Sequence, residues 1–290
     1  MRALWLENQK LALRSDIPKP DAPLVRVLFA GICNTDIELT RGYYPFRGIP
    51  GHEFVGELNG KRVVGEINAV CHTCDACLGG RPTHCENRTV LGIKERNGAF
   101  AEYLTLPAEN LHVIPDAIET EEAVFIEPIA AALEIQEQIQ ISAGDRVLVV
   151  GHGKLGRLIA RTLALTGCDL TVASRGAAVP EKHFDIVVEC SGNPEGFEVA
   201  RRAVRPRGTI VMKSTYAGDL TINASSLVVD EITLIGSRCG PFDKAIDLLA
   251  ARKIEVRDLI DAVYPLDDAI AAFDHAQRKG ALKVLIRCRE

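Results

Sequence analysis

A stretch of four cysteines, CHTCDACLGGRPTHC, constrains this chain more than any other part of its sequence. The spacing is C-x2-C-x2-C-x7-C, and the two-residue gaps let neighbouring thiolates converge on one small cation without straining the backbone. Four thiolates also complete a tetrahedral zinc site that keeps no position open for chemistry. We therefore interpret the cluster as a structural zinc site, with a pair of disulfides or unpaired core cysteines as the alternatives. Its residues are Cys71, Cys74, Cys77 and Cys85.

The cysteine count and the charge indicate the kind of compartment and partner. Nine cysteines, an odd number with four at metal spacing, fit a reducing cytoplasm better than a disulfide framework. A net charge of -5 argues against nucleic acid or an anionic membrane as a partner. The start, MRALWLENQKLAL, is too polar for a signal peptide. No apolar run reaches the roughly 18 residues that a membrane span needs. We expect a cytoplasmic protein.

The first part of the chain, to about residue 125, predicts a β domain. Short alternating runs separated by turn signals are typical of antiparallel strands in a barrel-like sheet. Asn59-Gly60 is a tight hairpin signal between two of them. The runs are Leu24–Ala30, Phe54–Leu58, Arg62–Ile67 and Phe100–Leu106.

Two metal-binding residue types stand on loops of this β domain. Cys33 begins CNTD after the first strand, and His52 lies in PGHE just before the next. A lone cysteine usually packs and a lone histidine usually has an ordinary hydrogen-bond partner. Their coincidence with the four-cysteine stretch in one domain favours a second metal site.

The segments CNTD, GHEFVGE, the four-cysteine stretch and GAFAEY, in this order, resemble the zinc-containing medium-chain alcohol dehydrogenases. The resemblance extends over essentially the whole chain and points to the polyol, glucose and threonine dehydrogenase branch. It implies a GroES-like β-barrel catalytic domain and a Rossmann domain with a doubly wound parallel sheet. The expected domains are residues 1–130, catalytic, and 131–262, dinucleotide-binding. Residues 263–290 are then expected to return to the catalytic domain.

The resemblance also implies a catalytic zinc site. Cys33 and His52 would be ligands, and Asp36 would hold the other ring nitrogen of His52. Thr35 would be the hydroxyl that takes the proton of the alcohol. A catalytic zinc needs about three protein ligands and an open position for substrate.

The third ligand differs from that of many relatives. Glu127, in FIEPI, matches the Glu of an EP motif in the polyol branch and would bind zinc directly or through water. The alternative is a first-turn Glu stabilised by the helix dipole. Glu53 could coordinate when substrate is absent. Glu38 stands where many members carry a relay histidine, so the proton leaves through Glu38, or from Thr35 through the cofactor ribose and water. The hairpin after Glu53 is also shorter than in relatives.

The second part of the chain predicts a dinucleotide-binding fold. A buried-strand run, RVLVV, precedes GHGKLG, a helical pattern follows, and a second strand, Asp169–Ala173, comes next. A GxGxxG motif in this strand–turn–helix setting is strong evidence, because the glycines allow a tight turn and close approach of the pyrophosphate to the helix N-terminus. The expected contacts are Gly151, Gly153, Lys154, Leu155 and Gly156.

The end of that second strand bears on which cofactor binds. NAD binders usually place a carboxylate there for the ribose 2′-hydroxyl, but Ser174 occupies the position and Arg175 follows. The missing carboxylate removes repulsion against a 2′-phosphate, and Arg175 supplies a bidentate partner for it. The sequence favours NADP over NAD. The alternative is that Arg175 is a solvated surface residue and both cofactors bind.

The connection after Arg175 is unusually short. Only eight residues, Gly176 to His183, precede the next strand, Phe184–Cys190, whereas a crossover with its helix needs a dozen or more. Extended, eight residues reach about 26–29 Å, enough to pass one strand but not to form a helix. We predict that one helix and one edge strand of the usual fold are lost, which would leave the adenine side of the cofactor pocket open.

Strands and helices alternate in the remainder, and ligands gather at the carboxyl ends of such strands. Ser191 follows a strand there, and Arg238 lies in a loop that resembles the one closing over the cofactor in relatives; a surface arginine is the alternative.

Together these features predict a zinc-dependent NADP or NAD alcohol dehydrogenase with two zinc ions per chain. Its substrate would be a small alcohol, polyol or sugar hydroxyl, or the matching carbonyl. We expect a homodimer or homotetramer, as in relatives. Two alternatives are a zinc-free quinone or enoyl reductase of the same superfamily, and a dinucleotide-binding sensor without enzyme activity.

Overall fold

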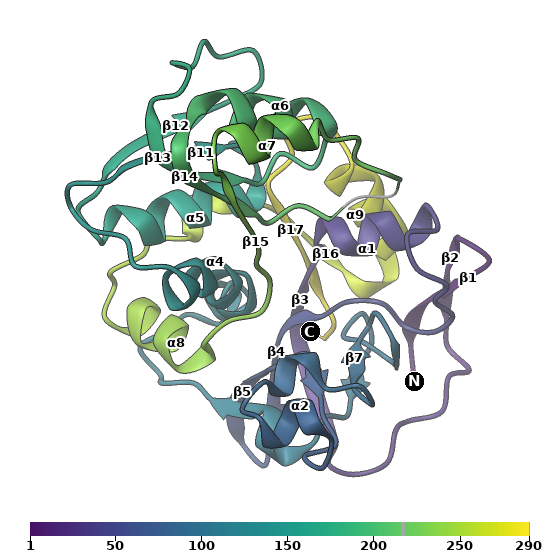
Figure 1. The fold of residues 1–290 in the computed structure, drawn as a ribbon. Helices are drawn as coiled ribbons and strands as arrows, with labels where there is room; N and C mark the ends of the chain where they lie inside the picture. The colour runs from purple at the N-terminus through teal and green to yellow at the C-terminus, as the bar shows by residue number, and fades with distance from the viewer. Residues whose placement is uncertain (216–217, 290) are drawn as a thin grey trace. The chain divides into compact units, whose positions relative to one another are not determined.

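The computed structural model describes residues 1–215 and 218–289, which form two compact units (Figure 1). The first unit comprises Met1–Glu127 and Phe242–Glu290, and the second comprises Pro128–Pro241. The first border falls inside helix α4 (Ile126–Gln138), close to the expected border at residue 130. The second lies at Pro241, earlier than the expected residue 262, so the chain returns to the first unit sooner than the sequence indicated.

Helix α8 (Phe242–Ala250) explains the earlier return. Its first residue, Phe242, stacks on His112 with ring centroids 5.4 Å apart. Asp243 lies 3.1 Å from the same imidazole. These contacts attach the start of α8 to strand β10 (Leu111–Val113) of the first unit, a long-range relationship that the local helical pattern does not reveal.

The first unit is built on a seven-stranded sheet with the order β10-β5-β4-β3-β17-β16, and β9 also pairs with β3. All its pairs are antiparallel except β16 with β17. Because β17, near the C-terminal end, pairs with β3, both ends of the chain build this unit. The strands are β3 (Val25–Gly31), β4 (Glu53–Leu58), β5 (Lys61–Gly65), β9 (Tyr103–Leu104), β10 (Leu111–Val113), β16 (Ile260–Pro265) and β17 (Lys283–Arg287).

Local sequence signals explain the β4–β5 hairpin. Asn59 and Gly60 both have positive φ, 50° and 76°, as a two-residue hairpin turn of the kind expected from Asn-Gly requires. The pairing of Gly56 with Val63 and Leu58 with Lys61 follows from this turn.

Smaller elements surround the main sheet of the first unit. The strands are β1 (Ala3–Glu7) and β2 (Lys10–Arg14), which form a hairpin, and β6 (Asn68–Ala69), β7 (Thr89–Leu91) and β8 (Glu95–Arg96), which form a small sheet. The α-helices are α1 (Asn34–Thr40), α2 (Asp75–Leu78), α3 (Thr120–Ala123) and α9 (Ala269–Ala276). The 3-10 helices are η1 (Pro82–His84), η2 (Ala108–Asn110), η3 (Arg257–Leu259) and η4 (Leu266–Asp268).

The second unit is a five-stranded parallel sheet with the order β12-β11-β13-β14-β15. Helices α5 (Lys154–Ala164) and α6 (Pro194–Ala203) lie on opposite faces of this sheet (Figure 1). Its strands are β11 (Arg146–Val150), β12 (Asp169–Ala173), β13 (Phe184–Glu189), β14 (Val204–Met212) and β15 (Thr233–Gly236). A further helix is α7 (Ala224–Val229).

The sheet confirms the prediction of a shortened Rossmann fold. Between the end of β12 and the start of β13 the chain forms neither helix nor strand. Strand β12 is therefore an edge strand, and the next strand along the chain pairs on the other side of β11. Alternating residues such as Leu148, Val150 and Val187 form the core with α6, and Val179 of the short connection packs against it.

No helix among the described residues is both long and apolar enough to cross a bilayer.

Candidate active site

The first unit brings three of the predicted catalytic-zinc ligands together. Cys33 follows β3 and caps helix α1, while His52 immediately precedes β4. Strands β3 and β4 are antiparallel neighbours with Gly31 opposite Glu53, so the end of one and the start of the other meet. One ligand atom each of Cys33, His52 and Glu53 lies within 4.8 Å of the others. A thiolate, an imidazole and a carboxylate are donors that zinc accepts.

Asp36 holds this group in place from the buried side. It is fully buried, and its carboxylate accepts the backbone N–H groups of Cys33 (2.8 Å) and Gly51 (3.1 Å). Its Oδ1 also lies 3.2 Å from Nδ1 of His52, which leaves Nε2 for a metal. Burial opposes protonation of His52, but Asp36 and then Cys33 outweigh it, so the pKa of His52 lies well above its ordinary value.

Glu53, rather than Glu127, joins Cys33 and His52. The Oε2 of Glu53 pairs with the Nζ of Lys283, and both side chains are buried. Burial lowers the pKa of Lys283, but Glu53, Cys33 and Glu127 raise it more, so the pKa lies above the ordinary value. Glu127 is half-buried in the first turn of α4 and lies outside the clustered ligand atoms of the described residues. Glu127 is therefore a neighbour of the Glu53–Lys283 ion pair.

The two predicted proton-transfer residues differ in their surroundings. Thr35 Oγ1 lies 3.7 Å from Cys33 Sγ, beside the ligand group. The carboxylate of Glu38, on the next turn of α1, accepts a hydrogen bond from Arg41 at 2.8 Å. Thr35 is thus placed beside the metal ligands, whereas Glu38 is engaged with a cation on its own helix.

The four-cysteine stretch has the dimensions of a zinc site. The Sγ atoms of Cys74 and Cys77 are 3.6 Å apart, those of Cys71 and Cys85 are 3.5 Å apart, and all four ligand atoms lie within 4.8 Å of one another. Zinc–sulfur bonds of about 2.3 Å give a tetrahedron edge of about 3.8 Å, whereas a disulfide requires about 2.05 Å. The four thiols are free. The geometry fits four thiolate ligands and excludes a pair of disulfides.

The cysteines of this stretch differ in the pKa of their thiols. Hydrogen bonds from the Thr73 hydroxyl and then from backbone N–H groups lower the pKa of Cys71 to about 5. Backbone N–H groups, first that of Cys77, also lower the pKa of Cys74. Burial and the neighbouring thiols raise the pKa of Cys77 to about 12. Without a cation the cluster therefore keeps at least one proton, which a bound metal would displace.

The glycine-rich turn of the second unit has the shape that the motif predicts. Gly151 has φ +117°, and a Cβ there would lie 2.8 Å from the carbonyl oxygen of Cys190. A Cβ on Gly156 would lie 2.0 Å from the carbonyl oxygen of Gly151. Gly153 caps α5, just before Lys154 and Leu155, and a Cβ there would meet nothing within 4 Å. Two glycines are needed for packing, and the third leaves open backbone surface where a pyrophosphate could approach.

Residues at the carboxyl ends of the neighbouring strands complete this edge. Ser174 and Arg175, which follow β12, are exposed. After β13, the N–H and Oγ of Ser191 both donate to buried Glu189, at 2.7 and 2.5 Å. Ser191 therefore shapes the turn with its hydroxyl already engaged. The next residue, Gly192, donates its N–H to the Oγ of Ser214 after β14 at 2.8 Å.

Lys213, which no sequence motif indicated, organises the same edge. This buried residue follows β14, and its Nζ donates to Ala131 O (2.6 Å), Ser237 Oγ (3.2 Å) and Arg238 O (3.0 Å). The contacts join α4, β14 and the segment after β15. Arg238 thus has its backbone fixed by Lys213. A lysine directly after the apolar run TIVM was the available signal, because lysine is seldom buried without partners.

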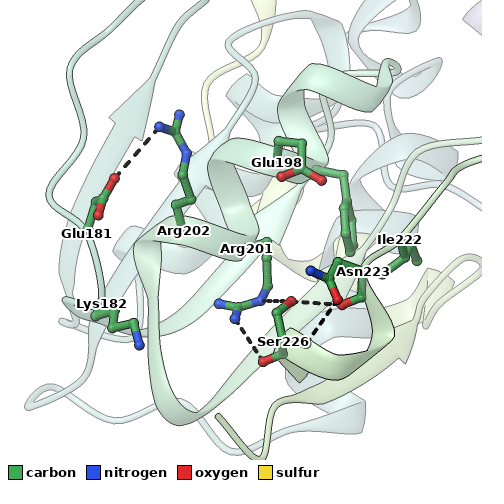
Figure 2. Close-up of a pocket in the computed structure, with 9 residues that line it drawn as sticks. Glu181, Lys182, Glu198, Arg201, Arg202, Ile222, Asn223 and Ser226 are labelled. Atoms are coloured by element: carbon green, nitrogen blue, oxygen red, sulfur yellow. Dashed lines mark hydrogen bonds and ion pairs between the residues drawn. The ribbon is translucent and has the colours of Figure 1, made fainter. Parts of the chain in front are cut away.

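A separate cavity of about 270 Å³ lies at the amino-terminal ends of β13 and β14 (Figure 2). Arg201 crosses it and donates to the Oγ (2.9 Å) and carbonyl oxygen (2.8 Å) of Ser226 and to Asp230 (2.7 Å). Lys182 also pairs with Asp230, at 3.1 Å. These bonds join α6 to α7 at the edge opposite the glycine-rich turn, so the cavity is separate from the predicted cofactor site.

Comparison with known proteins agrees with this picture. The alcohol dehydrogenase GroES-like domain matches residues 19–116, and the zinc-binding dehydrogenase domain matches residues 143–251. D-arabinitol dehydrogenase 1 of Uromyces fabae is 26% identical and the match covers 99% of this chain and 97% of that protein. L-galactonate-5-dehydrogenase of Escherichia coli is 29% identical, with 86% of each chain covered.

The alignment with the arabinitol dehydrogenase extends over 340 positions, more than the 290 residues of this chain, so the relative carries segments that this chain lacks.

Two solved structures share the fold over the full length. The alcohol dehydrogenase TADH of Thermus sp. ATN1 superposes with a TM-score of 0.90 at 26% identity and covers 100% of both chains. A Sinorhizobium meliloti structure described as that of a zinc-binding dehydrogenase bound to NADP gives 0.88 at 27% identity, covering 99% of this chain and 98% of the other. With both domain matches and the thiolate and glycine sites in place, the chain belongs to the zinc-containing medium-chain alcohol dehydrogenase family.

Proposed function

We propose that this protein is a zinc-dependent oxidoreductase that transfers a hydride between a hydroxyl-bearing carbon and a nicotinamide cofactor. The observation that carries the proposal is the convergence of Cys33, His52 and Glu53 beside Thr35. This donor set differs from the four thiols of the other cluster because, among the described residues, three ligand atoms converge here. Three ligands leave a coordination position for substrate.

Each residue of the site has a role in this reaction. Zinc bound to Cys33, His52 and Glu53 would act as a Lewis acid on the substrate oxygen. Thr35 accepts the hydroxyl proton, since its Oγ1 lies beside the ligand group. Asp36 fixes the orientation of His52 through Nδ1.

Glu127 and Glu38 have supporting roles in the proposal. Glu127 acts on the ligand group electrostatically or through water, because its charge reaches Lys283. Glu38 passes a proton to solvent only if it leaves Arg41, so the route from Thr35 through the cofactor ribose and water is the more direct one.

The cofactor in this proposal is NADP in preference to NAD. The pyrophosphate would rest on the turn from Gly151 to Gly156 at the start of α5. Strand β12 ends in Ser174 and Arg175, which together offer a hydroxyl and a cation to a 2′-phosphate and no carboxylate to repel it. Bound nicotinamide would supply the hydride acceptor or donor.

The substrate class is a polyol, a sugar or a sugar acid, or the matching carbonyl compound. This proposal rests on analogy, because relatives across the chain are named for D-arabinitol, L-galactonate and sorbitol. We further propose a cytoplasmic enzyme that assembles as a homodimer or homotetramer.

Metal analysis combined with turnover tests the proposal. The purified protein should hold two zinc ions per chain and oxidise at least one polyol or sugar acid with NADP or NAD. Replacement of Cys33 by Ser should remove one zinc and the activity, and replacement of Cys168 by Ser in the other unit should remove neither. A chain that holds one zinc or none contradicts the catalytic-zinc assignment. Cofactor binding without turnover across a broad panel would instead indicate a dinucleotide-binding sensor.

A further inference from the structure

In the second unit, ligands are expected to bind at the edge formed by the carboxyl ends of the parallel strands. The carboxyl end of β12 is the outer boundary of this edge. Directly after the strand, the chain turns, with the Ala177 N–H donating to Ser174 O at 3.0 Å and Gly176 at φ +82°. Every residue from Ser174 to Ala178 is exposed. The chain thus presents Ser174 and Arg175 at this edge and then leaves it.

The rest of the connection runs to the opposite edge of the sheet as a strap. Val179 packs against the core on the α6 face. The N–H groups of Lys182 and His183 donate to the carbonyl oxygens of Arg202 (2.7 Å) and Ala203 (2.8 Å), where α6 ends. One strap therefore replaces the helix and strand that would otherwise continue beyond β12, and none of its residues can form a wall beside the end of that strand.

The exposure of β12 itself shows the consequence. Strands inside a parallel sheet are normally buried on both faces. In β12, Thr171 is exposed on one face, and Val172 is 36% exposed on the other. In a doubly wound fold the adenosine half of a dinucleotide lies at the end of this second strand, where a carboxylate usually holds its ribose. Among the described residues, the Ser174–Arg175 turn and the turn at Gly192 lie at this carboxyl edge of the sheet.

We infer that the protein binds its cofactor mainly through the pyrophosphate and nicotinamide half and leaves the adenosine half in solvent. A nicotinamide mononucleotide, which lacks adenosine altogether, is then an alternative cofactor. This inference rests on the proposed function, because it takes the glycine-rich turn as the pyrophosphate site. It extends that function to a class of smaller cofactors.

The same geometry limits how Arg175 selects NADP. Its guanidinium is at the exposed end of an edge strand, and a solvent-exposed ion pair contributes little and is screened by salt. The affinity difference between NADPH and NADH therefore arises from a solvent-exposed interaction of Arg175 with the 2′-phosphate. This difference falls as the salt concentration increases, whereas affinity for the uncharged parts of the cofactor does not.

Fluorescence titration of the metal-loaded protein with NADPH, NADH and reduced nicotinamide mononucleotide tests the inference. The expected Kd of the mononucleotide lies within about a hundredfold of that of NADPH, and the preference for NADPH over NADH disappears near about 0.5 M salt. A larger ratio overturns the inference, as does a preference that survives high salt.

Two variants, together with ligand binding by the unmodified protein, distinguish failure of this inference from failure of the proposed function. Arg175→Ala should abolish the preference for NADPH and leave mononucleotide affinity unchanged, while Arg207→Ala, at an exposed position within β14, should change neither. A decrease in mononucleotide affinity with Arg175→Ala overturns the inference. Failure of the unmodified protein to bind any of the three ligands overturns the proposed function itself. Tight NADPH binding with no mononucleotide binding overturns the inference alone.

Discussion

The carboxylate of Glu53 and the ammonium group of Lys283 form an ion pair in the interior of the first unit, although 230 residues separate them in the chain. The side chains are 2% and 3% exposed. Glu53 begins β4 and Lys283 begins β17, and both strands pair with β3. The same carboxylate belongs to the group of Cys33 and His52, so Lys283 and a metal ion would share it.

We predict that Lys283→Met destabilises the protein strongly, because it leaves the buried charge of Glu53 without its partner. Breaking such a pair costs about 3–5 kcal/mol, and denaturant unfolding of the metal-free protein measures it. Lys279→Met, at an exposed site, should change stability by less than about 0.5 kcal/mol.

The double variant Glu53→Gln with Lys283→Met should recover part of the loss, because neither buried charge then remains. If Lys283→Met alone unfolds at the same denaturant concentration as the unmodified protein, the pair does not stabilise the fold. Zinc content of the folded double variant then reports whether Glu53 is needed as a ligand.

Asp36 provides the second prediction, which concerns metal affinity. Asp36→Asn keeps the shape of the side chain but weakens its hold on His52 Nδ1 and on the N–H groups of Cys33 and Gly51. Loss of such an outer partner typically costs about 10–100-fold in metal affinity, and competition with a chromophoric chelator measures it. The four-cysteine site is an internal control, since its zinc should be retained. Equal loss of both ions would indicate general unfolding instead.

Local patterns in the sequence were sufficient for much of the fold. The Asn59-Gly60 turn and the glycine-rich turn each depend on residues that are close in the chain, so spacing and residue type identify them. The shortened sheet was also predictable, because eight residues after Arg175 cannot form a crossover helix. In each case the length of the connecting chain or the backbone conformation of a turn limits which local structure can form.

Long-range partners could not be obtained in this way. Lys283 meets Glu53 only because β17 and β4 flank β3, and no local signal states that register. The choice of Glu53 over Glu127 as the neighbour of Cys33 and His52 depends on the same packing. Lys213 was missed because a lysine after a strand is ordinarily exposed.

Lys213 provides the third prediction. Lys213→Met keeps the aliphatic volume but removes three hydrogen bonds, to Ala131, Ser237 and Arg238. Hydrogen exchange of residues 236–240 should then accelerate even without cofactor, because a charge-assisted bond contributes about 1.5–3 kcal/mol. Lys213→Arg should restore part of the protection, and exchange in α6 should stay constant. Unchanged exchange in residues 236–240 would show that this lysine does not hold the segment.

The fourth prediction concerns the pH dependence of stability through His112. Its Nε2 lies 3.0 Å from Glu66 and its Nδ1 lies 3.1 Å from Asp243. The Glu66 hydrogen bond is the main cause that raises the pKa of His112 above its ordinary value, against the opposing effect of burial, and Asp243 adds to it. A pKa raised by folding means that the protonated imidazole stabilises the folded state. This contribution is complete below the unfolded-state pKa of about 6.5 and is lost as the pH rises through the folded-state pKa.

The comparison that checks this is the unfolding free energy of the unmodified protein and of His112→Gln between pH 6 and pH 9. The stability difference between them should be larger at pH 6, by less than about 1 kcal/mol, because Glu66 and Asp243 are well exposed to solvent. The stacking of His112 on Phe242 does not require the charge, so part of the difference should persist at pH 9. A difference that grows with pH would mean that His112 is held in its neutral form.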